Sequence, residues 1–392
     1  MKTIAVIFGS RSAEHDISII TAISSIIRPL EASKEYKVEA VYIAKDGSWF
    51  WDDKLKDIAL YQSGDIEQYM RKAPKVQLQF DGGLTLVKSS QFAGRKQYKK
   101  IDIVFPALHG TYGEDGALMG LLEMANVPYI GCDIASSAIA MDKVLSRQIA
   151  EVNDIPVPKY EYLTAKTFAS KTDEVMKGLT KSLKFPLFVK PARLGSSIGI
   201  SRVESERELT NAIEVALHYD DKAIVEEAVQ NLVEVTVPIM GNRDTDLTYG
   251  LVEQPLSPED GVFDFDTKYM NQGKGGKKMG GGKAAGAQGY SKLPADISDK
   301  LTEESRRVAG AVYRSVGCEG IARIDLLINE KKKIVYFNEI NPLPGSLYNH
   351  NWRASGIANV DLVSKLVDLA EERAANKKSL NTTFTTNFLK QF

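Results

Sequence analysis

Hydrophobic and polar positions along the first third of the chain predict strands separated by a helix. Residues 3–8 (TIAVIF) predict a buried strand that ends at Gly9. Residues 16–30 have helical spacing, and residues 37–43 (KVEAVYI) predict a second strand. This succession is typical of a parallel sheet, so we expect an α/β domain at the N-terminus.

The next segment is less regular. DGSWFWDD and FDGGLTLV indicate hairpin turns within residues 45–100, and residues 101–108 (IDIVFPAL) predict a strand that stops at HGTYGEDG. Residues 116–131 predict a helix and then a strand. The segment ASSAIAMDKVLSRQIAEVND predicts another helix, after which the chain becomes extended at IPVPKY.

Three domains are expected, at residues 1–131, 132–227 and 228–392. The length of 392 residues also favours two or three domains. A stretch rich in Gly and Lys within residues 270–292 cannot form a core, so it predicts a mobile surface loop in the last domain.

The bulk composition narrows the class of protein. Hydrophobic residues make up 43% and charged residues 26%, as in soluble globular proteins, and a net charge of −1 gives no reason to expect a nucleic-acid or membrane partner. Cys132 and Cys318 form no CxxC pair, so we expect free thiols in a reducing cytoplasm. The N-terminus predicts a strand and not a signal peptide, and no apolar run approaches the length of a membrane span.

The segment GIARIDLLINEKKKIVYFNEINPLPGS predicts two strands joined by a charged turn. If the turn is centred on Lys332, antiparallel pairing places Asp325 opposite Glu339 and Arg323 opposite Asn341, all on one face. Opposed carboxylates repel one another unless a cation lies between them, and Asp, Glu and Asn oxygens suit Mg²⁺. The alternative is a surface ion pair in which Arg323 neutralises Asp325.

Two other segments offer candidate nucleotide contacts. FPLFVK predicts a strand that ends in Lys190, and the backbone N–H groups of the following turn, LGSSIGI, can cradle phosphate oxygens. The turn is not a Walker A sequence, and an ordinary hairpin turn is the alternative. Downstream, Glu226, Glu227 and Glu234 lie in or beside two strand-like runs, where acidic side chains can bind the amino group and ribose of a nucleotide. A solvated acidic loop is the alternative there.

In their order along the chain, these motifs resemble the ATP-grasp ligases and, within them, the D-alanine–D-alanine ligases. GSRSAEHDISI (9–19) and HGTYGEDGALMGLLEMANVPYIG (109–131) are similar to the two N-terminal signatures of that family. MDK, VKPARLGSSIG, ARID and NEIN follow in the family's order, so the resemblance covers roughly residues 1–370. It implies an α/β N-terminal domain with a parallel sheet, followed by a two-lobed α+β ATP-grasp fold.

The resemblance implies that the protein joins two D-alanines through an acyl phosphate, for peptidoglycan precursors, with ATP and two Mg²⁺ ions (Mn²⁺ as an alternative). Asp325, Glu339 and Asn341 would bind the metal ions. Arg323 and the backbone N–H of Gly345 would stabilise the acyl phosphate and the tetrahedral intermediate. The residues implied at ATP are Lys143, Lys190, Ser197, Glu227, Glu234 and Lys268.

Further roles are implied at the substrates. Glu14 would bind the ammonium group of the first amino acid, with His109 near the same pocket. For His109 the alternative is a buried, hydrogen-bonded residue that ends a strand. Glu14, Ser196 and Tyr269 match a hydrogen-bonded trio that closes the lid, and Tyr269 favours an amide over an ester product. A homodimer is also implied.

One segment departs from the family pattern Asn-Thr-x-Pro-Gly-x-Thr-x-x-Ser. It reads NPLPGSLYNH here, so Pro342, Leu347 and His350 replace the two threonines and the serine. That serine helps to bind the carboxylate of the second substrate. His350 can still donate a hydrogen bond and can add positive charge at mildly acidic pH. Two alternatives therefore stay open: a ligase with another acceptor (a D-amino acid, a hydroxy acid or a peptide amine) and a non-catalytic nucleotide-binding protein.

Overall fold

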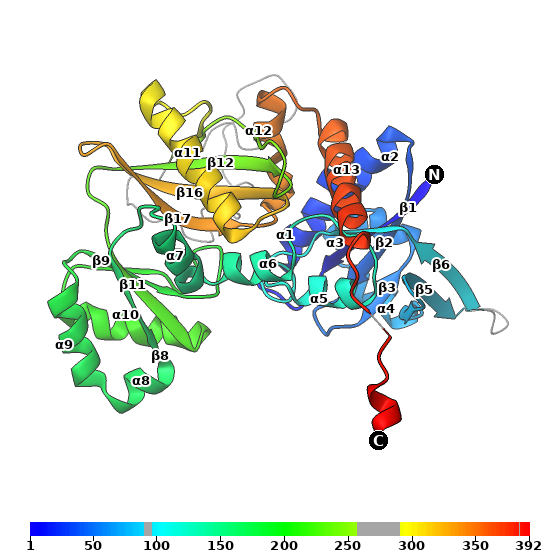
Figure 1. The fold of residues 1–392 in the computed structure, drawn as a ribbon, viewed down its shortest axis with the longest axis horizontal. Helices are drawn as coiled ribbons and strands as arrows, with labels where there is room; N and C mark the ends of the chain where they lie inside the picture. Colours follow the sequence, from blue (N-terminus) through cyan, green and yellow to red (C-terminus); the bar gives the residue numbers. More distant parts are fainter. Residues whose placement is uncertain (90–95, 257–290, 384) are drawn as a thin grey trace.

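The computed structural model describes residues 1–89, 96–256, 291–383 and 385–392. Figure 1 shows an N-terminal domain on one side and two further lobes on the other. Helix α6 (Ile134–Met141) lies between the domain and the lobes, and helix α7 (Lys143–Val152) lies between the two lobes. A mostly parallel sheet is followed by two antiparallel sheets, which confirms the predicted fold class. No helix among the described residues is long and apolar enough to cross a membrane.

The N-terminal domain is built on the sheet β3-β2-β1-β7. Strand β1 pairs in parallel with β2 and β7, as predicted, and β3 forms an antiparallel edge. The helix expected at residues 16–30 runs through α1, η1 and α2, and its middle part is π-helical just before Pro29, a residue that lacks the N–H of a regular helix. The elements are β1 (Lys2–Gly9), α1 (His15–Ile20), η1 (Thr21–Ile27), α2 (Arg28–Ser33), β2 (Tyr36–Ile43), β3 (Trp49–Trp51), η2 (Asp53–Lys56), α3 (Ala59–Gln62), α4 (Ile66–Lys72), β4 (Gln77–Phe80), β5 (Leu84–Ser89), β6 (Lys96–Ile101), β7 (Ile103–Pro106) and α5 (Ala117–Met124).

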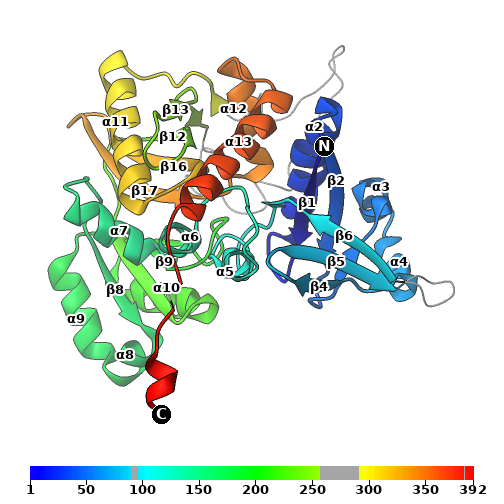
Figure 2. The same cartoon turned by 45° about the vertical axis from the view of Figure 1, so that its right-hand side comes forward.

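The central lobe is the antiparallel sheet β10-β9-β11-β8, with helices α8, α9 and α10 packed on one face. The single helix expected before it is broken at Asp142, whose carboxylate accepts hydrogen bonds from the N–H groups of Val144 and Leu145 and so caps α7. Helix α7 lies between the central and C-terminal sheets (Figures 1 and 2). The elements are β8 (Tyr160–Thr164), α8 (Ala165–Ser170), α9 (Thr172–Ser182), β9 (Leu187–Pro191), β10 (Ser201–Val203), α10 (Glu206–Tyr219) and β11 (Lys222–Glu227).

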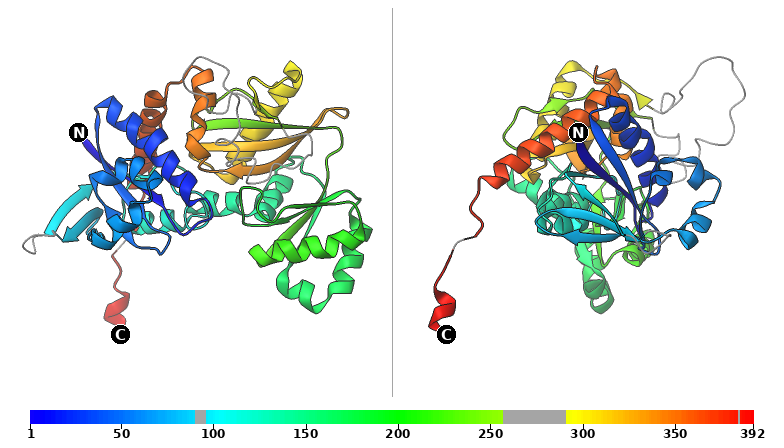
Figure 3. Two further views of the ribbon diagram at one scale, coloured as in Figure 1. Left: turned by 180° about the vertical axis from the view of Figure 1, so that it is seen from behind. Right: turned by 90° about the vertical axis from the view of Figure 1, so that its right-hand side faces the viewer.

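The C-terminal lobe is the antiparallel sheet β13-β12-β16-β17. One face shares a hydrophobic core with α11, α6 and α7, and the other face carries the polar residues described below. Beyond α13 the last residues extend away from the body of the protein (Figure 3). The elements are β12 (Leu232–Gly241), β13 (Thr248–Tyr249), β14 (Gln254–Pro255), β15 (Ser291–Lys292), α11 (Asp299–Val316), β16 (Gly320–Asn329), β17 (Ile334–Asn341), η4 (Gly345–Tyr348), α12 (Asn349–Ala354), α13 (Asn359–Lys378) and η5 (Phe388–Gln391).

The pairing of β16 with β17 confirms the expected register at the polar positions. Asp325 lies opposite Glu339, and Arg323 lies opposite Asn341. Closer to the turn, however, Leu326 pairs with Phe337, so β17 contains one extra residue. The turn is therefore not centred on Lys332, and the predicted register holds only because a β-bulge follows the turn.

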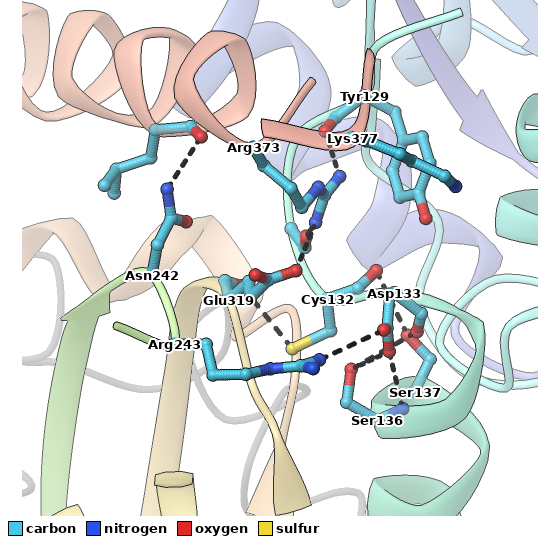
Figure 4. Close-up of polar contacts among 12 residues, drawn as sticks. Tyr129, Cys132, Asp133, Ser136, Ser137, Asn242, Arg243, Glu319, Arg373 and Lys377 are labelled. Atoms are coloured by element: carbon cyan, nitrogen blue, oxygen red, sulfur yellow. Dashed lines mark hydrogen bonds and ion pairs between the residues drawn. The ribbon is translucent and has the colours of Figure 1, made fainter. Parts of the chain in front are cut away.

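Helix α13 and the end of the N-terminal domain hold the domains together (Figure 4). Leu362, Val363, Leu366 and Val367 of α13 share a core with β1, β2 and α2, although the sequence places α13 in the third domain. On the same helix, the Arg373 guanidinium donates to the carbonyl oxygens of Tyr129 and Gly131 and lies 3.5 Å from a Glu319 carboxylate oxygen. Nearby, Cys132 and Cys318 are buried free thiols, as predicted.

We expect Arg373→Met to lower the free energy of unfolding by about 2–4 kcal/mol, because two carbonyl groups and a carboxylate lose their buried donor. Chemical denaturation followed by fluorescence measures this change. Lys377→Met is the matched control on the same helix, since Lys377 is 56% exposed and its ion pair with Glu123 should contribute less than about 1 kcal/mol. Equal losses in both variants would mean that Arg373 does not join the domains.

Candidate active site

Polar side chains gather on the face of the C-terminal sheet opposite α11. Thr236 pairs with Asp325, and Asp325 pairs with Glu339, so the three side chains share that face. The Thr236 hydroxyl donates to Asp325 Oδ1 at 2.8 Å. Ile324 and Ile340 point to the hydrophobic core on the other side. A shift of either strand by one residue would turn its polar side chains into that core, so the core selects this register.

Asp325 and Glu339 each have a cationic neighbour on this face. Arg323 binds Asp325 through two hydrogen bonds of 2.9 and 2.7 Å, so the ion pair considered as an alternative is present. The two side chains are only 21% and 18% exposed. Burial works to lower the pKa of Arg323, but the adjacent Asp325 raises it overall. Lys143 Nζ lies 3.3 Å from Glu339 Oε2. Each of the two opposed carboxylates therefore has a positive charge beside it.

The donor set fits a divalent metal ion that also binds phosphate. Among the residues that the structure describes, no three acidic, His or Cys side chains form a metal-binding group. Asp325 and Glu339 supply two carboxylates, and Asn341 supplies an amide oxygen on the same face. Mg²⁺ typically takes one or two carboxylates and completes its shell with water and substrate phosphates, so this small set of hard oxygen ligands is adequate.

The first residue of α7, Lys143, connects this face with the Gly/Ser-rich turn. Its Nζ donates to the carbonyl of Leu194 at 2.8 Å while it lies beside Glu339. In the turn, Ser196 and Ser197 both have positive φ angles, of 54° and 60°. In a turn with such backbone angles, successive N–H groups can point to one side and form a concave site for an anion such as phosphate. The Ser196 hydroxyl donates to the carboxylate of Glu14, so the central lobe contacts the N-terminal domain here.

Glu14 is partly buried and lies near a second acidic side chain, that of Glu114. Burial raises the pKa of its carboxyl, and the nearby carboxylate of Glu114 raises it further. His109 Nε2 is 2.9 Å from the hydroxyl of Thr21, and its Nδ1 is 3.9 Å from Glu114 Oε1. His109 is thus a buried, hydrogen-bonded residue near Glu14. A cation such as an ammonium group would relieve the repulsion between the two carboxylates.

The turn after β17 is pinned against the N-terminal domain. Ser346, Leu347 and Tyr348, which follow Gly345, all have left-handed φ angles of 52–54°, an unfavourable conformation for residues with a Cβ atom. The N–H of Ser346 donates to Thr21 Oγ1 at 2.9 Å, and Leu347 is fully buried in the N-terminal core. Such strain persists only where the surroundings enforce it, and it places the Gly345 backbone next to α1.

A second ionic cluster lies where the central lobe meets β17. Lys190 forms an ion pair with the buried carboxylate of Glu226, and Arg147 binds the other oxygen of that carboxylate at 2.5 Å. Burial alone would raise the pKa of Glu226, but the two cations hold it below its usual value. Two cations face one anion, so the cluster carries an excess positive charge that favours an anionic ligand such as phosphate.

Glu226 and Glu227, which are adjacent on β11, point to opposite faces of the central sheet. Side chains alternate along β11, so Glu226 shares a face with Lys190 while Glu227 points to the opposite face. There the Glu227 carboxylate accepts a hydrogen bond from the N–H of Lys184. The Glu227 side chain therefore does not lie on the Lys190 face, and its contact with adenine stays a prediction.

The other predicted residues are distributed as follows. Glu234 lies on the polar face, two residues before Thr236 on β12. His350, on α12, places Nε2 3.0 and 2.9 Å from the two carboxylate oxygens of Glu253. Lys268 and Tyr269 lie outside the described residues.

Several residues of the site were not singled out in the sequence: Glu114 beside Glu14, and Arg147, Thr236, Glu253 and Asn338. Arg147 follows Lys143 by one helical turn, and Thr236 follows Glu234 at strand spacing, so periodicity could have indicated both. Glu253 lies in an irregular segment, and Asn338 is distinguished only as the inserted residue of the bulge. No local sequence pattern therefore indicates either residue.

Comparisons with known proteins agree across almost the whole chain. The family models described as D-ala D-ala ligase N-terminus and D-ala D-ala ligase C-terminus match residues 3–132 and 149–368. A D-alanine–D-alanine ligase of Chloroherpeton thalassium is 35% identical over 96% of this chain and 98% of the relative, and one of Acetivibrio thermocellus is 35% identical over 95% and 96%.

Solved structures show the same similarity. The D-alanine-D-alanine ligase from Coxiella burnetii has a TM-score of 0.77 at 28% identity and covers 96% of both chains. The VanG D-Ala:D-Ser ligase from Enterococcus faecalis has a TM-score of 0.76 at 28% identity, over 94% of this chain and 99% of the other.

Proposed function

This chain belongs to the D-alanine–D-alanine ligase family, and we propose that it joins two D-alanine molecules, with conversion of ATP to ADP and phosphate, for peptidoglycan precursors. One observation supports this most directly: residues of the three domains converge on the polar face of the C-terminal sheet. Ser196 reaches Glu14 of the N-terminal domain, and Lys143 reaches Glu339 of the sheet.

ATP and a divalent metal ion are the cofactors that the family implies, and we assign two Mg²⁺ ions to Asp325, Glu339 and Asn341. Bound there, the ions would neutralise the β- and γ-phosphates of ATP. The excess positive charge beside Glu226 supports Lys190 as a phosphate ligand, and Lys143 extends this charge toward Glu339. Ser197, Glu234 and the backbone at Glu227 complete the proposed nucleotide site, with Lys268 as a further predicted contact.

The chemistry follows from charge and position. A carboxylate oxygen of the first D-alanine attacks the γ-phosphorus of ATP, ADP leaves, and an acyl phosphate forms. Glu14 holds the ammonium group of this D-alanine, with His109 and Glu114 completing the pocket. The amine of the second D-alanine then attacks the acyl carbon, loses a proton and expels phosphate. Arg323 and the N–H of Gly345 stabilise the oxygen that becomes negative in this step.

A different second substrate is the other candidate function, and the contacts of His350 favour it. The pKa of Glu253 stays below its usual value because hydrogen bonding and charge from His350 outweigh the effect of burial. An ionised carboxylate only accepts hydrogen bonds, so His350 Nε2 must donate. With Nε2 held by Glu253, only Nδ1 of His350 is left to contact the second substrate, and this contact differs from that of the serine in the family pattern. The similarity to a D-Ala:D-Ser ligase is consistent with this.

Phosphate release with ATP, Mg²⁺ and D-alanine alone, with the product identified by mass spectrometry, tests the proposed function. We expect phosphate and D-alanyl-D-alanine in equal amounts. No release with D-alanine, but release after D-serine or D-lactate is added, would instead support a different acceptor. ATP binding without phosphate release, whichever acceptor is added, would support a non-catalytic nucleotide-binding protein.

Competition between D-alanine and D-serine tests the role of His350. We expect His350→Ser to lower the share of D-alanyl-D-serine about fivefold, because a serine hydroxyl can donate to the acceptor carboxylate. His218→Ser, on α10 of the central lobe, is the control for loss of a histidine elsewhere. An unchanged product ratio would show that His350 does not select the acceptor. The implied homodimer is a separate prediction, and light scattering in solution would measure it.

A further inference from the structure

The metal site depends on one inserted residue in β17. On the turn side Leu326 pairs with Phe337, and on the site side Asp325 pairs with Glu339, so Asn338 is the extra residue of a β-bulge. If the register of the turn side continued without this residue, Glu339 would pair with Ile324 and point into the α11 core. The bulge therefore keeps Glu339 and Asn341 on the same face as Asp325.

Arg147 of α7 holds this bulge from outside the sheet. Strand β17 is an edge strand, so the backbone groups on its outer side need partners from elsewhere. Arg147 Nη1 donates to the carbonyl of Phe337 at 2.5 Å, and the Phe337 N–H donates to the carbonyl of Pro156 at 2.8 Å. Arg147 Nη2 lies 3.3 Å from Asn338 Oδ1. The inserted residue and its neighbour are thus fixed through both backbone and side chain.

The same arginine is tied to the proposed phosphate-binding lysine. Its side chain is 0% exposed, and its charge is balanced by Glu226, which also binds Lys190. Lys190 Nζ is in turn 3.4 Å from Asn338 Oδ1. The buried guanidinium has three partners: the Phe337 carbonyl, the Glu226 carboxylate and the Asn338 amide. Moving any of them would leave a buried charge without a hydrogen bond, which costs stability. One network therefore joins the bulge beside the metal ligands to Lys190 of the central lobe.

We propose that Arg147 is a positioning residue, which fixes the bulge at Asn338 so that Glu339 and Asn341 can bind metal with Asp325, and which aligns Lys190 with that metal site. This inference rests on the proposed function for the metal site but not for the amino acid substrates. Arg147 does not touch the reacting atoms; it acts through the Phe337 carbonyl, the Asn338 amide and Glu226.

Binding of Mn²⁺ in the presence of ADP, measured by electron paramagnetic resonance, tests the proposal without turnover. We expect Arg147→Met to weaken Mn²⁺ binding about tenfold or more, the usual effect of losing a residue that orients a metal ligand, and Asn338→Ala to weaken it about threefold or more. Val335→Ala is the matched control, because Val335 lies on the same strand, is buried in the α11 core and is absent from the network. It should lower thermal stability with Mn²⁺ affinity unchanged within about twofold.

The outcomes are distinct. The proposal would be overturned if Asn338→Ala bound Mn²⁺ within about twofold of the natural protein. It would also be overturned if Asn338→Ala and Val335→Ala had equal stability and lost Mn²⁺ affinity equally. Asn338→Ala decides the matter if Arg147→Met does not fold. A natural protein that binds Mn²⁺ with ADP but forms no dipeptide would refute the proposed function alone. Failure of the natural protein to bind Mn²⁺ would refute the metal site and this inference together.

Discussion

Replacing Asp325 by Asn, or Glu339 by Gln, is expected to abolish measurable ligation. Each change keeps the size of the side chain but removes one of the two negative charges that face each other on the sheet. With only two carboxylates and one amide in the proposed donor set, loss of either charge should greatly weaken metal binding. We expect kcat/KM for ATP to fall on the order of 10³-fold, about 4 kcal/mol of transition-state stabilisation.

A phosphate-release assay over a range of Mg²⁺ concentrations measures this effect. Thr236→Val is the control, since it removes the hydrogen bond to Asp325 but no proposed ligand, and it should cost far less activity. High Mg²⁺ should restore part of the activity of Glu339→Gln if the loss is one of affinity. Near-normal activity in either carboxylate variant would show that the metal assignment is wrong.

Replacing Arg323 by Met should lower kcat much more than it changes the KM for ATP. The guanidinium is fixed by Asp325 and lies 5.5 Å from the centre of the Tyr348 ring, so it is held in place before substrates bind. Such a group contributes most where negative charge develops, in the acyl phosphate and tetrahedral intermediate. We expect kcat to fall about 10²–10³-fold, with the KM for ATP changed less than about threefold.

Steady-state kinetics with saturating D-alanine separates these two quantities. Arg323→Met should not weaken Mn²⁺ binding, because it removes a positive charge from beside the proposed metal ligand Asp325. Arg323→Lys keeps the charge but not the two parallel hydrogen bonds, so it should recover only part of the lost kcat. Equal losses in kcat and ATP affinity would instead identify a structural arginine.

Strands, helices and the alternation of side chains along a strand could be predicted from the sequence. Strands β1 and β2 and the helix between them follow from short apolar runs and helical spacing, because the residues of each element bury a face at that element's own period. Alternation likewise placed Arg323 and Asp325 on one face of β16, and Glu339 and Asn341 on one face of β17. The predicted pairing across the two strands is correct only because a bulge compensates for the misplaced turn centre. The order of the motifs also indicated the family, since several matches in sequence are more specific than one.

Contacts between distant segments were decided only by the tertiary structure. The turn at Lys332 did not reveal the extra residue Asn338, because the bulge is held by Arg147 from another lobe. The sequence does not distinguish the adjacent carboxylates of Glu226 and Glu227. Only the pairing of β11 with β9 shows which of them lies on the same face as Lys190. By itself the sequence determined the first strands and their helix, and which residues of one strand share a face, since these depend on near neighbours. Which charges meet across domains depends on packing, and packing brings together residues that no local pattern relates.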